Sequence, residues 1–153
     1  MNTKTNPISP LKTQTVGLDS YERFENEVME NLNFKELQLS GSRFSSNLFK
    51  NVTFKSCVFF AGRFEDCEFV NCRFEDCKFQ FFHVAQCTFS TCEFTNCTWE
   101  VSPIQQNSFN HCLMDVKTSY FLGKGQNTME YCFSNTPVSW DSTKIIEELN
   151  IAA

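Results

Sequence analysis

Apolar residues recur every five positions through most of the chain. Counting in steps of five from Phe34 to Met114 gives seventeen positions, all of them apolar and twelve of them Phe. A second set of positions lies two residues before each of these and holds eight of the nine Cys. The repeating unit is therefore Cys-x-Phe-x-x, which is clearest in the segment FEDCEFVNCRFEDCKF at residues 64–79.

This spacing predicts a coil with four extended sides. An α-helix would repeat its apolar stripe about every 3.6 residues and a continuous strand about every two, so neither element explains the pattern. In extended backbone, residues two apart point to the same side, which places both the Cys and the Phe of each unit inside. The remaining three positions point outward and turn the corner. Four units close one coil, and successive coils stack at about 4.8 Å, so the fold class is an all-β solenoid of four to five coils.

In such a coil, residues twenty apart lie in one column, and one column allows a check. Its small inward positions are Ser42, Gly62, Phe82 and Ser102, and its large ones are Phe44, Phe64, Val84 and Ile104. The only Phe at a small position is thus paired with a Val at a large position. Close packing requires such an exchange of volume, so the sequence predicts that Phe82 and Val84 are both in the core.

Nine Cys in 153 residues raise three functional possibilities: a metal site, a set of disulfides or a reactive thiol. Cys at a spacing of five project from successive sides of the coil and do not converge as metal ligands do. Columns such as Cys57, Cys77 and Cys97 lie within disulfide range, but a reducing compartment leaves them as thiols. We therefore expect the Cys to fill the core, with no metal and no cofactor, and Cys132 to be the one that is exposed.

The chain divides into five predicted segments. These are a mobile N-terminal segment (1–17), an N-terminal cap (18–31), the solenoid (32–116), a loop with an irregular last coil (117–139) and a C-terminal amphipathic helix (140–153). In the cap, Glu22 and Glu27 fall on small inward positions where charge is costly, which predicts a cap, a distorted first coil or a short helix. Residues 117–128 are expected to loop out, after which Tyr131, Phe133, Thr136 and Val138 fit a last side or two in a shifted frame.

The sequence does not predict an enzyme. The only two His, His83 and His111, occupy outward positions with no nucleophile at a meaningful offset. A Gly-Lys-Gly triplet at residues 123–125 lacks the spacing of a phosphate-binding loop. No stretch approaches the roughly 18 consecutive apolar residues that a membrane span needs.

The outward positions of one side form an apolar stripe. It consists of Val58, Phe60, Ala61, Phe81 and Val101. A soluble monomer should not leave such a stripe bare, so either a terminal segment folds over it or it is a dimer or partner interface.

Charge argues against direct binding of nucleic acid. The formal net charge is −5, of which residues 32–116 carry −2, and no basic face is predicted. Mimicry of nucleic acid would need a strongly acidic face, for which one cluster is a partial candidate. This acidic cluster consists of Glu65, Asp66, Glu68, Glu75 and Asp76.

The Cys-x-Phe-x-x units of residues 32–114 resemble the pentapeptide-repeat family, whose fold is a right-handed quadrilateral β-helix. Within the tail WDSTKIIEELNIAA, the part from Ser142 to Ala153 also resembles the C-terminal helix of the gyrase-protecting members, the quinolone-resistance (Qnr-type) group and a microcin immunity protein. The resemblance implies a two-fold dimer and a rod that engages DNA gyrase in place of DNA. It also implies that the dimer contacts are Trp140, Ile145, Ile146, Leu149 and Ile151.

These observations lead to two functional hypotheses for a non-catalytic binding protein. The first is protection of a type II topoisomerase, DNA gyrase, by DNA mimicry in a bacterial cytoplasm, giving quinolone or toxin resistance. The second is a protein–protein interaction scaffold or a secreted effector, in which residues 1–17 serve as a secretion signal and Phe60 and Phe81 contact the partner. An organising role within a larger assembly is a third possibility that the sequence does not rank.

Overall fold

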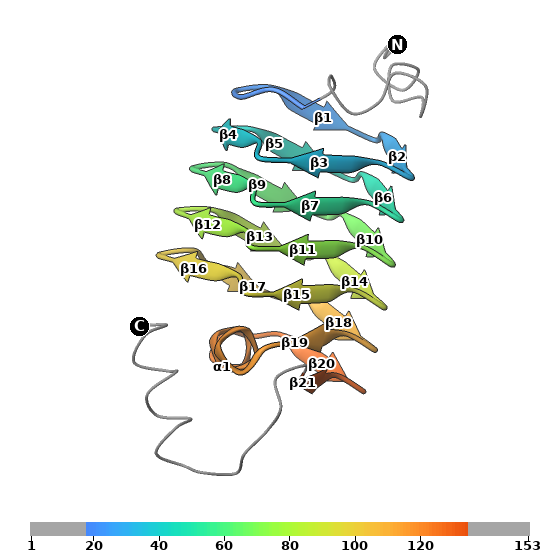
Figure 1. The fold of residues 1–153 in the computed structure, drawn as a ribbon, viewed down its shortest axis with the longest axis vertical. Coiled ribbons are helices and arrows are strands. Elements are labelled where there is room, and N and C mark those ends of the chain that lie inside the picture. The colour runs from blue at the N-terminus through green and yellow to red at the C-terminus, as the bar shows by residue number, and fades with distance from the viewer. Residues whose placement is uncertain (1–17, 135–153) are drawn as a thin grey trace.

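The computed structural model describes residues 18–134, which wind into a four-sided parallel β-solenoid of about five turns (Figure 1). Each side of the square is one parallel sheet. Sheet A contains β1 (Arg23–Glu25), β5 (Arg43–Ser45), β9 (Arg63–Glu65), β13 (His83–Ala85) and β17 (Ile104–Gln105). Sheet B contains β2 (Val28–Glu30), β6 (Leu48–Lys50), β10 (Glu68–Val70), β14 (Thr88–Ser90), β18 (Ser108–Asn110) and β20 (Thr128–Glu130).

The other two sides are built in the same way, and one helix follows the fifth turn. Sheet C contains β3 (Asn33–Lys35), β7 (Thr53–Lys55), β11 (Arg73–Glu75), β15 (Glu93–Thr95), β19 (Leu113–Met114) and β21 (Phe133–Ser134). Sheet D contains β4 (Gln38–Ser40), β8 (Val58–Phe60), β12 (Lys78–Gln80) and β16 (Thr98–Glu100). The helix is α1 (Val116–Gly123). The predicted fold class, an all-β solenoid of stacked square coils, is confirmed.

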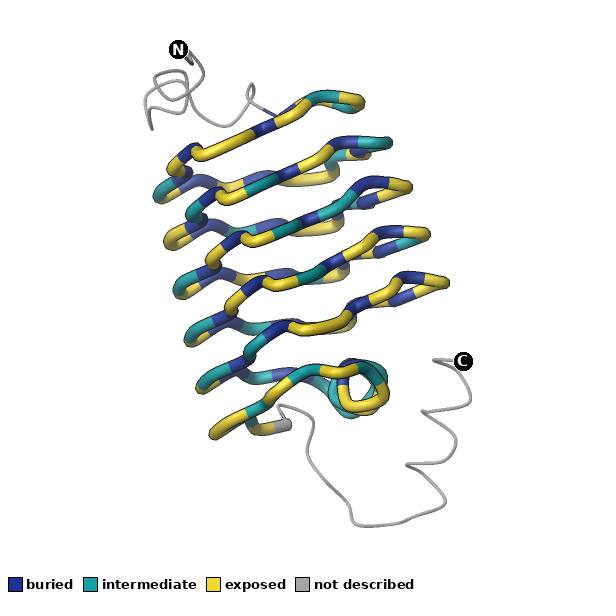
Figure 2. Tube along the Cα trace, turned by 180° about the vertical axis from the view of Figure 1, so that it is seen from behind, coloured by how far each residue is buried: buried dark blue, intermediate teal, exposed yellow. Residues whose placement is uncertain are grey.

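Every strand pairs with a strand of a neighbouring coil, and paired residues are twenty positions apart. Phe49 is in register with Phe69, and Phe69 with Phe89. The corners are tied in the same way, since the N–H of Asp66 donates to the carbonyl of Ala85 at 3.0 Å. Buried and exposed residues alternate around each coil, and the buried positions of successive coils lie above one another (Figure 2).

Stacked Phe rings fill the axis of the rod. In sheet B the rings of Phe49, Phe69 and Phe89 lie parallel, with centroids 4.6 Å apart. Rings from neighbouring sheets meet edge to face, as Phe64 and Phe69 do at 5.0 Å and 68°. Both arrangements are the ones that aromatic quadrupoles favour, so the core gains from ring geometry as well as from burial.

The Cys residues line the core next to the Phe stacks. Eight of them are buried, all nine are free thiols, and Cys132 is partly buried. Seven of the eight buried thiols donate to a carbonyl of the coil before them, as the Cys97 thiol does to the carbonyl of Phe74 at 3.2 Å. The eighth, Cys87, donates to the carbonyl of Ala85 on its own coil and accepts from the N–H of Cys67. Their predicted role as small core residues is confirmed, because Cys fills the narrow space and its weak donor is satisfied.

Polar residues at the same small positions bridge consecutive coils with stronger hydrogen bonds. The side chain of Asn107 accepts from the N–H of Cys87 at 2.8 Å and donates to the carbonyl of Val84 at 3.0 Å. Asn47 bonds in the same way to the N–H of Glu27 and the carbonyl of Phe24. These amides are buried but paired, so they stabilise the stacking instead of opposing it.

The predicted exchange of volume within sheet A is confirmed. Phe82 and Val84 are both buried, with exposed fractions of 1% and 2%. The ring of Phe82 extends toward the coil above, where Gly62 leaves room for it; a Cβ at Gly62 would lie 3.0 Å from this ring and would collide with the backbone of Ser42.

The N-terminal cap is a regular coil. Residues 18–31 contain β1 and β2, and Leu18, Phe24 and Met29 are buried like the large residues of the later coils. Of the two charged residues at small positions, Glu27 is buried and Glu22 only partly so. The alternative of a short helix is wrong, because pairing of β1 with β5 and of β2 with β6 outweighs the unfavourable charge.

Residues 117–128 are expected to loop out, but the structure has helix α1 in the first part of this segment. The contacts of the helix explain why it forms. The ring of Trp99 would be exposed at the end of sheet D, and α1 covers it: Phe121 stacks on Trp99 at 5.7 Å and the Trp99 Nε1–H donates to Thr118 Oγ1 at 3.1 Å. Asp115 caps the helix by accepting from the N–H of Thr118 at 2.8 Å.

The shifted frame expected after the helix is also wrong. Strands β20 and β21 resume the original register, in which Met129 pairs with Phe109 and Ser134 with Met114. Tyr131 and Phe133 therefore point outward and are 68% and 62% exposed. The predicted residues Thr136 and Val138, the segment 1–17 and the helix at 140–153 lie outside the described residues. No helix in the described part of the chain is long and apolar enough to cross a membrane.

The burial of the thiols predicts two classes of reactivity. Burial raises the pKa of the Cys87 thiol far above its ordinary value, and burial also raises that of Cys132, but only Cys132 has partial access to solvent. A thiol reagent at pH 8 should modify one Cys in the folded protein and all nine in denaturant. The variant Cys132→Ser should lose the fast-reacting class, and fast modification of several thiols in the folded protein would contradict this packing.

Candidate interaction surface

The corners of the square differ in character, and one of them is the candidate interaction surface. At each corner one residue has a positive φ angle. Three corners are lined mainly by polar side chains. They are Asn26, Ser46, Asp66, Gln86 and Gln106 after sheet A; Asn31, Asn51, Asn71, Thr91, His111 and Tyr131 after sheet B; and Glu36, Ser56, Asp76 and Asn96 after sheet C. The fourth corner, between sheets D and A, contains Tyr21, Gly41, Ala61, Phe81 and Val101 and is the only one built without a charged, amide or aliphatic hydroxyl side chain among the described residues.

We call the exposed part of this corner the apolar edge. It consists of Tyr21, Phe60, Ala61, Phe81 and Val101, with exposed fractions of 80% for Tyr21, 41% for Phe60, 53% for Phe81 and 71% for Val101. The structure thus brings together most of the stripe predicted from sequence, while Val58 lies half-buried beside it on sheet D. Tyr21 was missed because it lies outside the regular repeats, although it is twenty residues before Gly41.

Side chains of the apolar edge contact one another along the rod. The rings of Phe60 and Phe81 meet edge to face at 5.7 Å. The ring of Tyr21 lies over Gly41, where a Cβ would come within 2.6 Å of it, so a larger residue at position 41 would displace this ring. The edge thus follows one corner of the rod, and at its centre two of its aromatic side chains are in contact.

The backbone of the apolar edge is strained. Phe81 has a φ angle of 51° and Val101 one of 45°, in the left-handed region. Gly, Asn and Asp adopt this region readily, whereas other L-residues lose about 1–2 kcal/mol and a β-branched residue is a genuine outlier. The polar corners use Asn and Asp at several of these positions, although residues such as Thr91 and Gln86 also have positive φ there. At the apolar edge, Phe81 and Val101 carry this cost with side chains that are bulky, apolar and largely exposed.

The structure does not bring the acidic cluster together. Glu65 lies on sheet A, Glu68 on sheet B and Glu75 on sheet C, while Asp66 and Asp76 occupy the corners after sheets A and C. Two of these carboxylates also face arginines: Glu65 pairs with Arg63 at 3.5 Å and Glu75 with Arg73 at 3.6 Å. The cluster therefore surrounds one coil instead of forming a patch on one face.

The remaining polar residues do not form a catalytic arrangement in residues 18–134. His83 is exposed on sheet A, and His111 stacks on Tyr131 with centroids 5.0 Å apart at the corner after sheet B. In this part of the chain no group of three or more His, Cys, Asp or Glu side chains could hold a metal ion.

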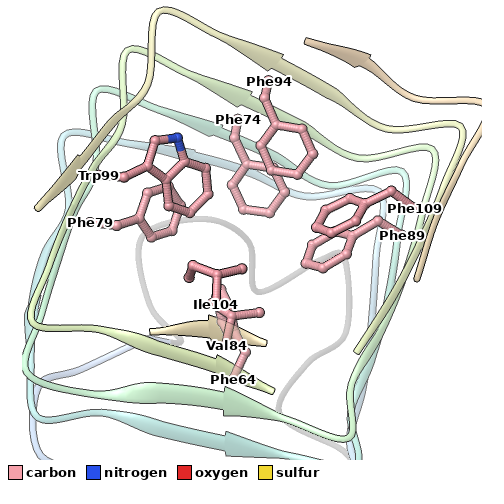
Figure 3. Close-up of a pocket in the computed structure, with 9 residues that line it drawn as sticks. All are labelled: Phe64, Phe74, Phe79, Val84, Phe89, Phe94, Trp99, Ile104 and Phe109. Atoms are coloured by element: carbon pink, nitrogen blue, oxygen red, sulfur yellow. The ribbon is translucent and has the colours of Figure 1, made fainter. Parts of the chain in front are cut away.

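The interior has a gap near sheet A that is too small for a ligand. Its volume is about 10 Å³, at the lower limit for a single water molecule, and its walls are apolar. Figure 3 shows the side chains around it: Phe64, Phe74, Phe79, Val84, Phe89, Phe94, Trp99, Ile104 and Phe109. The gap arises where Val84 and Ile104 replace Phe in the column and Ser102 is too small to compensate.

The predicted dimer contacts Trp140, Ile145, Ile146, Leu149 and Ile151 lie outside the described residues. The structure therefore gives no contacts for these five side chains, and dimerisation through the C-terminal helix stays a prediction.

Comparison with known proteins leaves the family of this chain open. No protein-family model matches the sequence, and no curated protein matches it. Among solved structures, two trypsin-treated variants of QnrB1, a plasmid-mediated fluoroquinolone resistance protein, are 14% and 12% identical, with TM-scores of 0.28 and 0.23. Each alignment covers 88% of this chain, and they cover 96% and 91% of the QnrB1 chains. A proposed glycosyl hydrolase from Parabacteroides merdae is 7% identical, with 88% of both chains covered and a TM-score of 0.19. At these TM-scores no function is transferred to this chain.

The strain at the apolar edge predicts that a polar substitution stabilises the fold. Val101→Asn should raise the free energy of unfolding by about 1 kcal/mol, because Asn tolerates positive φ and Val101 loses little buried area. Denaturant unfolding measures this change. The matched control is Asn26→Val, which puts Val at the same turn position of a polar corner and should lower stability by a similar amount. A destabilising effect of Val101→Asn would show that packing, not strain, dominates there.

Proposed function

We propose that this protein is a non-catalytic binding protein whose partner protein docks along the apolar edge. The observation that carries the proposal is the combination of exposure and strain at one corner. Phe81 and Val101 place bulky apolar side chains that are 53% and 71% exposed at positive φ, whereas the turns of the other three corners use mostly polar residues. Strain of this kind is typical of positions with a role other than folding.

The chemistry of the edge suits a protein partner. Tyr and Phe provide large rigid contact area at low cost in side-chain entropy and are enriched at the centres of protein interfaces. The apolar edge supplies two Phe and one Tyr within four turns of the rod. On one side the edge adjoins sheet D, which carries one basic and one acidic residue, Lys78 and Glu100, so this side is polar and balanced in charge, as an interface rim is.

DNA gyrase is the specific partner that the sequence resemblance implies. The sequence hypothesis assigns recognition to the acidic cluster through mimicry of DNA. We propose the apolar edge as the contact instead, because its residues lie side by side while the five carboxylates are distributed over three sheets and two corners. A bacterial cytoplasm, a homodimer and a role in quinolone or toxin resistance belong to the same hypothesis.

A partner can dock on the apolar edge only if no other segment of the chain covers it. A cysteine at position 81 tests whether the edge is accessible. In a Cys132→Ser background, Phe81→Cys should react with a thiol reagent as fast as an unhindered thiol, because position 81 is exposed. Slow reaction that becomes fast on deletion of residues 1–17 or 135–153 would show that a terminal segment covers the edge, and the proposed docking surface would then be wrong.

The gyrase hypothesis is tested by supercoiling assays with purified protein at micromolar concentration. We expect the wild type to change gyrase activity, with or without a quinolone, and the triple variant Phe60→Ser, Phe81→Asn, Val101→Asn to lose at least about tenfold in potency through lost apolar contacts. The matched variant Asn26→Ala, Asn51→Ala changes polar corners and should keep full potency.

A second variant separates the two modes of binding. Neutralising Glu65, Asp66, Glu75 and Asp76 to the corresponding amides should leave potency unchanged if the apolar edge is the contact. Loss of potency in this variant alone would favour DNA mimicry over the edge. No effect of the wild type on supercoiling would remove gyrase as the partner.

A further inference from the structure

Sheet A carries a column of basic side chains that a count of charges along the sequence does not reveal. Arg23, Arg43 and Arg63 are in register on consecutive strands, and His83 follows on the next. Neighbouring strands are about 4.8 Å apart, and like charges placed directly opposite each other destabilise a sheet. The column therefore places three guanidinium groups on one face within the length of three coils.

Carboxylates offset this charge only in part. The outward column two residues further along the strands contains Glu25, Ser45 and Glu65. Glu65 pairs with Arg63 on its own strand at 3.5 Å, but the equivalent position beside Arg43 is Ser45. Arg43, in the middle of the column, makes no ion pair with any residue of the described chain, and Arg23 and Arg63 flank it on the neighbouring strands.

A pocket lies at this place. It has a volume of about 180 Å³ and is lined by Arg23, Glu25, Arg43, Phe44, Ser45, Arg63 and Glu65. Three guanidinium groups face two carboxylates there, which leaves an excess of one positive charge. Arg43 and the hydroxyl of Ser45 lie at the centre of the lining and offer hydrogen-bond donors to an incoming group.

Sheet C shows that this arrangement is not a consequence of the repeat. Arg73 on β11 is the arginine of sheet C, and it is bonded on two sides: to Glu75 on its own strand at 3.6 Å and to Glu93 on the next strand at 3.1 Å. On sheet C two carboxylates therefore balance the charge of the arginine, whereas on sheet A the lining of the pocket contains more arginines than carboxylates.

We propose that the sheet A pocket binds a small oxyanion of the phosphate type. Arg43 presents two parallel N–H donors to two oxygens, Ser45 donates to a third, and Arg23 and Arg63 add positive potential from both sides. The excess of one charge and the two carboxylates in the lining favour a single phosphate group over a nucleic-acid backbone, and the column ends at Pro103 in the next coil. The pocket binds this ligand independently of the apolar edge.

The test is a calorimetric titration of the purified chain with inorganic phosphate, in low-salt buffer at constant ionic strength. We expect saturable binding of one phosphate per chain. Arg43→Gln should weaken it at least about tenfold, the amount that one charge-assisted bidentate contact supplies. Arg73→Gln is the matched control and should leave phosphate affinity unchanged, because Arg73 is already paired.

A second variant keeps the proposal testable if Arg43→Gln unfolds. Ser45→Glu restores the missing carboxylate beside Arg43, so it should retain or raise stability and abolish phosphate binding. The triple variant of the apolar edge should bind phosphate normally, which separates this site from the proposed function. Absence of saturable binding by the wild type, or equal affinity in wild type and Ser45→Glu, would overturn the proposal.

Discussion

The in-register hydrogen bonding between consecutive coils is the constraint on which the rest of the structure depends. Because each residue of the regular coils stacks directly on the one twenty positions earlier, side chains in one column have similar surroundings. Rings then stack on rings, thiols reach the carbonyls of the previous coil, and turns align into corners. Each coil touches only the coils next to it, so local changes in sequence alter one level of the rod and leave the others intact.

Most of the fold could be predicted because the five-residue period determines which side chains point inward, and the exchange between Phe82 and Val84 follows from the same rule. The structure that follows the last regular coil could not be predicted from this period. Helix α1 forms because Trp99 needs a cover and Asp115 provides a cap, and both contacts are invisible to a periodicity argument. After the helix, Asn127 accepts from the N–H of Asn107 at 3.1 Å and returns the chain to its original register.

The candidate sites, too, could be predicted from the sequence only in part. The apolar stripe was predictable because its members share one side of the square, but the positive φ of Val101 became apparent only with the backbone. Glu65 and Asp66 are adjacent in sequence yet belong to a strand and to a corner, so a cluster along the chain is not a cluster in space. Conversely, Arg23 and Arg43 are far apart in sequence and lie side by side, so surface charge in a solenoid is best counted by column.

Helix α1 also determines what the C-terminal end of the described rod can join. It lies beneath β16, where a fifth strand of sheet D would otherwise pair, while sheets B and C continue to β20 and β21 (Figure 1). The unpaired backbone groups at this end are therefore confined to part of the square and sit at different heights. A stepped, partly helical face offers another rod no flat template for strand pairing, which protects a parallel solenoid from growing end to end into a fibre.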